Sequence, residues 1–289
     1  MATVTQPLPR GGARWTGAIP YAVLFLFTVP ILVLYGWLLY GSFFPRMEGL
    51  RPIGGFTIEN WRFLWAPETV EALRFKAPVI PLTINTFIFA MSTALVVVLI
   101  SSMAGYALSR IRFPGRRTFL AGVLLLHSFP SVTLLIATFV VLRQLGLYDK
   151  LLGVILVQTA FELPFGVWIM KGFFDTVSWD LEMAALVDGA GRLRTWWRIV
   201  MPLVKPGLLA LGLLAFVSGW NQFLLPFIFM PSGNQQTLSV MIRALIGEGR
   251  FVDYGLVTAV GLYYMAPILI LFFIAQDRLL KIYAGGVKG

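Results

Sequence analysis

The chain has 289 residues, of which 58% are hydrophobic and only 12% charged, and its mean hydropathy is +0.82. A soluble globular protein carries about 25% charged residues, so this composition excludes water as the solvent for most of the surface. The formal net charge is +10, but the basic residues lie at the ends of apolar runs, which is typical of cytoplasmic anchoring and excludes nucleic acid as an expected partner.

Six apolar stretches follow one another along the chain, each long enough for one transmembrane helix. Residues 1–14, which contain prolines and paired glycines, are expected to form a disordered cytoplasmic lead. The uncharged stretches lie between Arg14 and Arg46, Lys76 and Arg110, Arg117 and Arg143, Lys205 and Arg243, and Asp253 and Asp277, and a sixth runs from Leu151 to Met170. The stretch after Lys205 is too long for one helix, and the polar residues from Pro231 onwards predict its exit loop.

The expected fold is therefore all-α and integral to the membrane, with about six transmembrane helices in a single domain, residues 1–289. Most Lys and Arg residues fall in the lead, after the second stretch, in residues 171–205 and in the tail, residues 277–289. Because cytoplasmic segments are enriched in Lys and Arg, the N- and C-termini are both expected in the cytoplasm.

Residues 171–205 form a long connection that is patterned as a helix, a turn and a second helix. Ser178 can cap a helix whose first turn holds Asp180 and Glu182, which suits the positive end of the helix dipole. Leu181, Ala184, Ala185 and Asp188 recur at the spacing of one helix face, where small side chains let a partner approach closely.

The second half of this connection supplies the turn and the second helix. Gly189 is expected to end the first helix, residues 192–200 to form the second, and Pro202 to block its continuation. Such a helical pair beside the spans is expected to be a docking element. The alternative is an amphipathic pair that lies on lipid.

The letters EMAALVDGA from Glu182 and IVMP from Ile199 resemble the coupling-loop signature of binding-protein-dependent ABC importer permeases. The chain departs from the signature at Met183, where the family has a glutamate that contacts the ATPase, and at Met201. The residues that the resemblance implies for coupling to the ATPase are Glu182, Met183, Ala184, Ala185, Asp188, Gly189, Ile199 and Pro202.

The resemblance extends over nearly the whole chain and is strongest to the carbohydrate branch, in particular to the second membrane subunit of maltose-type transporters. It is carried by FTIENW from Phe56, YALSRIRFPG from Tyr106, the pair Trp220 and Asn221, and the tail from Tyr283. It implies a type I importer permease in the inner membrane of a prokaryote. The implied partners are a second homologous permease, two ATPase subunits that bind ATP and Mg, an extracytoplasmic solute-binding protein, and membrane lipid.

The resemblance thus implies import of a sugar or sugar-like solute, with polyamine or another small polar solute as the alternative. The sequence has no G-x-x-x-x-G-K-[ST] motif, so ATP is expected on another chain and no cofactor on this one. An ion-coupled secondary transporter is less expected, because it generally needs a set of intramembrane ionisable groups. No cysteine, a single His127 and one intramembrane glutamate predict no catalytic residue and no metal site.

Polar and aromatic residues inside the spans are the candidates for the substrate pathway. Glu162 is expected either to line the pathway or to be paired structurally. Amides can bind sugar hydroxyls and aromatic rings can stack on a sugar face, although packing explains the rings equally well. The pathway candidates are Asn85, Glu162, Trp220, Asn221, Gln222 and Tyr263. The candidates for contact with the binding protein, or for ordinary surface polarity, are Asn234, Gln235 and Gln236.

Overall fold

A computed structural model describes residues 18–48, 51–66, 78–233, 235–247 and 253–285 of the chain. Its contacts form two compact units, residues 1–61 with 253–262, and residues 62–252 with 263–289. The single domain expected from the sequence stays a prediction. The disordered lead expected at residues 1–14 and the end of the tail lie outside the described residues.

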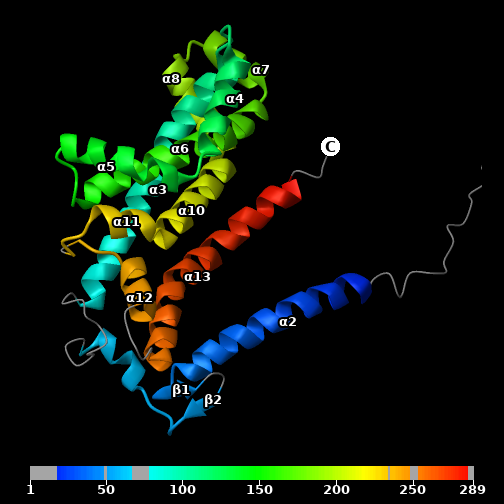
Figure 1. The fold of residues 1–289 in the computed structure, drawn as a ribbon. Helices are drawn as coiled ribbons and strands as arrows, with labels where there is room; N and C mark the ends of the chain where they lie inside the picture. Colours follow the sequence, from blue (N-terminus) through cyan, green and yellow to red (C-terminus); the bar gives the residue numbers. More distant parts are fainter. Residues whose placement is uncertain (1–17, 49–50, 67–77, 234, 248–252, 286–289) are drawn as a thin grey trace, which may run out of the picture. The chain divides into compact units, whose positions relative to one another are not determined.

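The described part is almost entirely helical, with one short hairpin (Figure 1). Its elements are α2 (Ala18–Gly41), β1 (Arg46–Glu48), β2 (Arg51–Ile53), the 3₁₀ helix η1 (Glu59–Leu64), α3 (Val79–Arg110), α4 (Arg116–His127), the 3₁₀ helix η3 (Ser131–Leu134), α5 (Leu135–Gln144), α6 (Leu151–Asp175), α7 (Trp179–Val187), α8 (Arg192–Thr195), the π-helical turn η4 (Trp196–Val200), α9 (Met201–Leu203), α10 (Lys205–Asn221), α11 (Leu224–Phe229), α12 (Leu238–Gly247) and α13 (Tyr254–Gly285).

Four described helices, α2, α3, α6 and α13, are long and apolar enough to cross a membrane. Two bent pairs pass the same test: α4 with η3 and α5, bent by 89°, and α8 to α9 with α10, bent by 74°. Counting each bent pair as one span gives six, in agreement with the prediction of about six transmembrane helices.

The first unit contains α2, the hairpin and the first residues of α13. The side chains of α2 are apolar on every side and mostly exposed within this chain, as in a helix that is covered by lipid or by another protein. Strands β1 and β2 pair antiparallel, with Arg46 opposite Ile53. After α2, the Asn60 amide donates hydrogen bonds to the carbonyl oxygens of Ser42 (3.0 Å) and Phe44 (2.7 Å), which satisfies backbone groups beyond the helix end.

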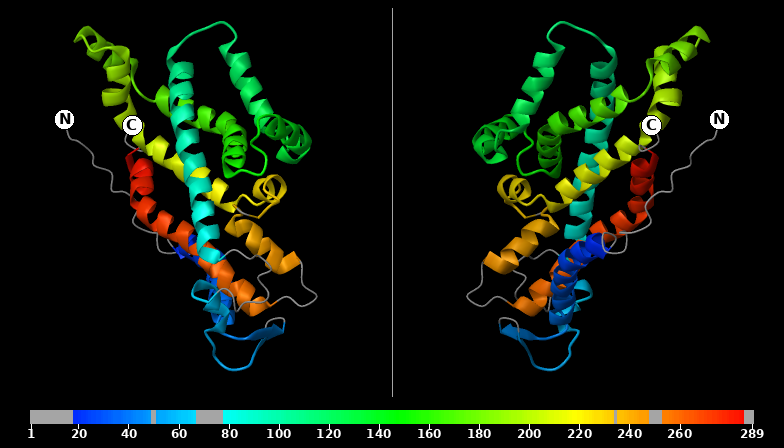
Figure 2. Two further views of the ribbon diagram at one scale, coloured as in Figure 1. Left: turned by 90° about the vertical axis from the view of Figure 1, so that its left-hand side faces the viewer. Right: turned by 90° about the vertical axis from the view of Figure 1, so that its right-hand side faces the viewer.

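The second unit is built on α3, α6 and α10, which pack side by side (Figures 1 and 2). Small residues allow the close approach of these backbones. A Cβ atom added at Gly105 of α3 would lie 2.8 Å from the backbone nitrogen of Lys171 in α6. One added at Gly219 of α10 would lie 2.9 Å from the Cα of Ala90 in α3. The buried core of this unit therefore lies where the three helices meet.

The chain after Lys205 is more broken than the predicted span and exit loop. Helix α10 ends at Asn221, Gln222 is extended, and the short α11 follows. The region from Pro231 to Asp253, expected to be a loop, contains α12, because Leu238 and Met241 recur at helical spacing and are buried. The sequence did not predict this helix, because the residues that precede it from Pro231 are mostly polar and are typical of a loop.

The helix, turn and helix predicted for residues 171–205 are present. Ser178 caps α7 by accepting a hydrogen bond from the backbone N–H of Asp180 at 3.2 Å, and Gly189 follows α7 with φ = +84°, a conformation that favours glycine. The second helix does not end at residue 200 as predicted: it runs through Pro202 to Leu203, and a break at Val204 then separates it from α10. The widened π-helical turn η4, which ends two residues before Pro202, makes room for the ring.

Candidate functional site

The first candidate site is the coupling loop, defined here as α7 to α9, residues 179–203. Glu182 points into the protein: its residue is only 3% exposed, and its carboxylate forms an ion pair with Arg110 at the end of α3. The hydroxyl of Tyr106, one turn earlier on α3, donates a hydrogen bond to the other carboxylate oxygen at 3.0 Å. Glu182 therefore anchors α7 internally and is turned away from the outer surface of the loop.

The coupling loop exposes several apolar and basic side chains. Leu181 is 49% exposed, and the exposure rises to 86% at Val187 and 77% at Leu193. Exposed apolar side chains gathered at one place mark interaction sites. We call the exposed apolar and basic side chains of residues 181–198 the docking face of the coupling loop; besides Leu181, Val187 and Leu193 they are Ala184, Trp197, Arg192, Arg194 and Arg198.

The other coupling residues expected from the signature take different positions. Ala184 is exposed, whereas Ala185 is buried. The expectation that both alanines present one face to a partner is therefore wrong. Met183 is half-buried, and Asp188 is exposed where α7 ends. Adjacent helical residues point about 100° apart, which separates the two alanines.

Near the end of the second helix, Ile199 is half-buried and Pro202 is exposed. Gly189 has open space around it, because an added Cβ would meet no atom within 4 Å. Its positive φ, rather than crowding, is what favours glycine at this position.

A second candidate site is a polar cluster between α6 and α10, formed by Gln158, Glu162, Ser218 and Gln222. Gln158 Nε2 donates hydrogen bonds to Glu162 Oε1 (3.0 Å) and Ser218 Oγ (3.2 Å), and the Ser218 hydroxyl donates to the same oxygen of Glu162. Gln222 Nε2 in turn donates to Gln158 Oε1 at 2.7 Å. The predicted residues Glu162 and Gln222 are thus brought together.

Gln158 and Ser218 were missed by the sequence reasoning. Gln158 precedes Glu162 by one helical turn, and two polar residues at that spacing on an apolar helix are a usable signal. Ser218 gave no such signal, because its partner lies on another helix.

The polar cluster remains partly open. Gln158 is buried, but Glu162, Ser218 and Gln222 are each half-exposed. A carboxylate at mid-membrane costs about 3 kcal/mol, while a hydrogen bond between helices returns roughly 1 kcal/mol. The bonds from Gln158 and Ser218 therefore do not fully offset the charge, which favours an aqueous or polar neighbour on the open side of Glu162.

The remaining pathway candidates do not join this cluster. Trp220 is fully buried, and its ring packs against Phe216 and Tyr264, so the expectation that it stacks on a sugar is wrong for this conformation and the packing alternative holds. Asn221 is exposed beside it. Tyr263 shares a hydrogen bond with the Thr83 hydroxyl at 3.0 Å.

Gln235 and Gln236, two of the residues expected to contact a binding protein, form hydrogen bonds within the chain, and their contact with a binding protein stays a prediction. Asn85 donates from its side chain to the backbone carbonyl of Gln236 at 3.1 Å. Gln236 is itself buried, and Gln235 accepts a hydrogen bond from the backbone N–H of Leu151 at 2.8 Å. Asn234 lies outside the described residues.

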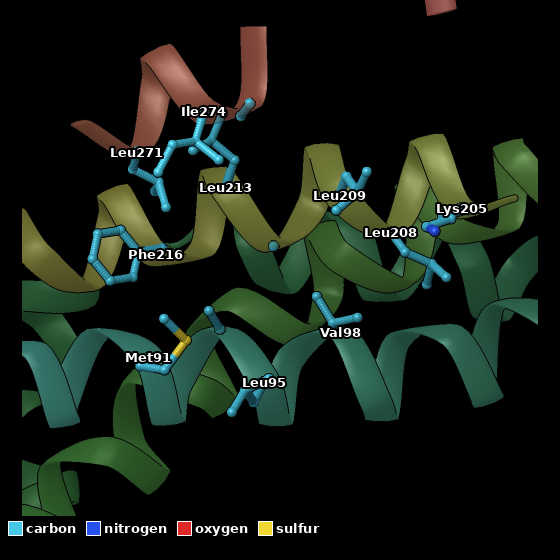
Figure 3. A pocket seen from close by; sticks show the side chains of 13 residues that line it. Met91, Leu95, Val98, Lys205, Leu208, Leu209, Leu213, Phe216, Leu271 and Ile274 are labelled. Atoms are coloured by element: carbon cyan, nitrogen blue, oxygen red, sulfur yellow. The ribbon is translucent and has the colours of Figure 1, made fainter. Parts of the chain in front are cut away.

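An apolar groove of about 470 Å³ lies between α3, α10 and α13 (Figure 3). Met91, Leu95, Phe216 and Leu271 line it, and Lys205 lies at one end. Its lining suits an apolar helix or acyl chains and offers little to a polar solute. Among the described residues, no three His, Asp or Glu side chains lie close enough together to hold a metal ion.

Relatives of this chain are transport permeases. It is 32% identical to the sulfoquinovosyl glycerol transport system permease protein of Agrobacterium fabrum, over 88% of this chain and 87% of the relative. It is 31% identical to a diacetylchitobiose uptake system permease protein of Streptomyces coelicolor, over 92% of this chain and 87% of the relative. It is 30% identical to the maltodextrin transport system permease protein of Bacillus subtilis, over 92% and 95% of the two chains.

The fold matches a solved structure of the same kind. A chain of a bacterial ABC transporter involved in the import of the acidic polysaccharide alginate superposes with a TM-score of 0.76 at 20% identity, covering 94% of this chain and 99% of that one. The family model for the inner membrane component of binding-protein-dependent transport systems matches residues 97–281, which include the coupling loop and the polar cluster. This chain therefore belongs to the family of binding-protein-dependent transport system inner membrane components.

Proposed function

We propose that this chain forms half of the transmembrane pathway of an ATP-driven importer for a carbohydrate or carbohydrate-like solute. The observation that carries the proposal is the pairing of the docking face on the coupling loop with a partly open polar cluster between two of the spans. Relatives named for sulfoquinovosyl glycerol, diacetylchitobiose and maltodextrin support the solute class.

The docking face receives a separate ATPase subunit that binds ATP and Mg. Val187 and Leu193 project as apolar anchors, and burying them against a partner supplies the free energy of docking. The exposed arginines of the docking face attract an acidic partner surface and speed its encounter. Two such ATPases serve the complete importer, one on this chain and one on the second permease.

The orientation follows from the placement of the basic residues. The coupling loop carries Arg192, Arg194 and Arg198, and cytoplasmic segments are enriched in such residues. The coupling loop and both termini therefore lie in the cytoplasm, and the α11–α12 region lies outside, where it receives solute from the binding protein.

The polar cluster is the part of the pathway that meets the solute. Sugar hydroxyls both donate and accept hydrogen bonds, and the cluster offers a carboxylate acceptor at Glu162 and amides at Gln158 and Gln222. The second permease supplies the opposite wall, and its helices together with lipid cover the apolar groove.

The proposal is tested by uptake into proteoliposomes that contain this chain, the second permease, the ATPase and the binding protein encoded with them. We expect uptake of a radiolabelled oligosaccharide that requires ATP and the binding protein. Uptake of a polyamine in its place would contradict the solute class, and uptake driven by an ion gradient without ATP would contradict the importer itself.

A further inference from the structure

We propose that Arg110 is a positioning residue of the transport cycle. Its buried ion pair with Glu182 joins the end of α3 to α7, so that a displacement of the coupling loop moves α3 with it. The inference rests on the proposed function, because it assigns a route by which the ATPase motion reaches the pathway wall.

Arg110 has several partners at the place where α6 ends and α7 begins. Its side chain is only 10% exposed, and the Nη2 group donates a hydrogen bond to the carbonyl oxygen of Val177 at 2.9 Å while Nε pairs with Glu182. The guanidinium also lies over the ring of Trp179, 5.5 Å from its centre. One side chain of α3 thus contacts the linker, the first residue of α7 and the middle of α7.

Neighbouring residues near the end of α3 add one more bond to α7 and two contacts to the end of α6. The Tyr106 ring packs edge-on against Phe174 at 5.5 Å while its hydroxyl donates to Glu182, so both carboxylate oxygens are taken by α3. Ser109 donates a hydrogen bond to Asp175 at 2.6 Å, and Asp175 forms an ion pair with Lys171. The bonds of Arg110 and Tyr106 to Glu182 thus tie α7 to α3, and the contacts with Phe174 and Asp175 tie the end of α6 to the same part of α3.

The ion pair is better suited to fixing geometry than to adding stability. Burying two charges has a desolvation cost that their attraction roughly offsets, so a buried pair is weak evidence for stability. The planar guanidinium, by contrast, donates hydrogen bonds in fixed directions, which here reach Glu182 in α7 and the carbonyl oxygen of Val177 before α7. A lysine at position 110 would keep the charge and lose these fixed directions.

Helix α3 can carry the motion across the membrane. At a rise of about 1.5 Å per residue, its 32 residues extend for about 48 Å. Toward its other end, Asn85 bonds to the backbone of Gln236 in the loop before α12, and between the two ends Gly105 packs directly against α6. A rigid helix held at both ends transmits displacement where a flexible link would absorb it.

The experiment uses the reconstituted importer and three variants: Arg110→Glu, Glu182→Arg and the double exchange. The measured quantity is solute imported per ATP hydrolysed, which a purely structural role in the folded complex would not alter. We expect each single variant to lower this ratio by about tenfold, within the usual range of coupling between sites, and the double exchange to recover most of it. Single variants at the wild-type ratio, or a double exchange no better than either single variant, would overturn the inference.

A second measurement does not depend on the folding of those variants. The chain contains no cysteine, so nitroxide labels can be placed uniquely within it at Met103 on α3 and Asp180 on α7, both exposed and outside the contacts between α3 and α7 described above. We expect the distance between these labels in the otherwise unchanged importer to stay constant when ATP binds. A distance that changes with ATP would show that α7 moves apart from α3. Failure of the unlabelled importer to take up solute with ATP would instead contradict the proposed function.

Discussion

Trp220 and Tyr264 are joined by two reciprocal hydrogen bonds. The indole Nε1 donates to the backbone carbonyl of Tyr264 at 3.1 Å, and the Tyr264 hydroxyl donates to the backbone carbonyl of Trp220 at 2.6 Å. Helix α10 ends at Asn221, so the carbonyl of Trp220 belongs to its last turn. Carbonyl groups in the last turn of a helix have no N–H partner within the helix. The pair therefore closes α10 and fastens it to α13 at the same time.

Tyr264→Phe removes the hydroxyl and keeps the ring. We expect it to lower the free energy of unfolding by about 1 kcal/mol, the usual value of one net hydrogen bond. Thermal unfolding of the purified chain in detergent measures the change, and Tyr35→Phe, at an exposed ring on α2, is the matched control. Equal unfolding temperatures for the two variants would contradict a role for the Tyr264 hydroxyl.

Gly219→Ala tests the contact of α10 with α3. An added Cβ would lie 2.9 Å from the Cα of Ala90, and backbone atoms cannot move aside cheaply. We expect a loss of about 1–3 kcal/mol, as for other overpacked cores. Gly212→Ala on the same helix is the control, because its nearest neighbour would be the Val98 side chain at an ordinary 3.5 Å. If both substitutions cost the same, the close approach of the helices is not as described.

Glu162→Leu separates the two roles that the sequence left open for this carboxylate. If Glu162 serves the solute, the variant keeps its stability, because it removes a charge that costs about 3 kcal/mol at mid-membrane, and uptake falls. We expect this result from parallel measurements of uptake and thermal unfolding, with Leu156→Ala at an exposed position of α6 as the control. Undiminished uptake with lowered stability would assign Glu162 a structural pairing instead.

Gly189 should tolerate some side chains and reject others. Space is open around it, but φ is +84°, so a β-branched residue is strained by about 1–3 kcal/mol while asparagine adopts this region more readily. We therefore expect Gly189→Val to lose ATP-dependent uptake and Gly189→Asn to retain most of it, with both proteins present in the membrane. Equal uptake by the two variants would mean that this turn does not set the geometry of the coupling loop.

The local features of the coupling loop could be predicted because they depend on residues that are close together in the sequence. Ser178 caps α7 and Gly189 follows it at positive φ, as the spacing indicated. The direction in which Glu182 points could not be predicted, because its partner Arg110 lies on another helix. The passage of the helix through Pro202 depends on the π-helical turn before it, and no residue type marks such a turn.

The spans were likewise predictable from their apolar length, and the interior of the second unit was not. Glu162 was a candidate because a lone charge in an apolar stretch stands out, whereas Ser218 has no such mark and joins it only through the packing of α6 with α10. Trp220 was a candidate because a tryptophan ring can stack on a sugar, but contact with Phe216 and Tyr264 buries it. Tertiary contacts decide these positions.

The docking face on the coupling loop is tested by Val187→Asp. Its side chain is 86% exposed, so the substitution leaves the packing of α7 intact while it places an unpaired charge in the proposed interface. We expect affinity for the ATPase to fall by about 2 kcal/mol or more, as for other interface anchors, measured by co-purification at graded concentrations. Thr176→Asp, exposed on the turn before α7, is the control and should leave assembly unchanged.

The central claim is that a separate ATPase binds this chain at α7 and α8. Photo-crosslinking in the native membrane tests it most directly. A photoreactive residue replaces Leu193, which is 77% exposed on the docking face, and a second variant carries it at Ile136, which is 82% exposed on α5. The account predicts that position 193 captures the ATPase chain and position 136 does not. Capture of lipid alone at position 193 would contradict it.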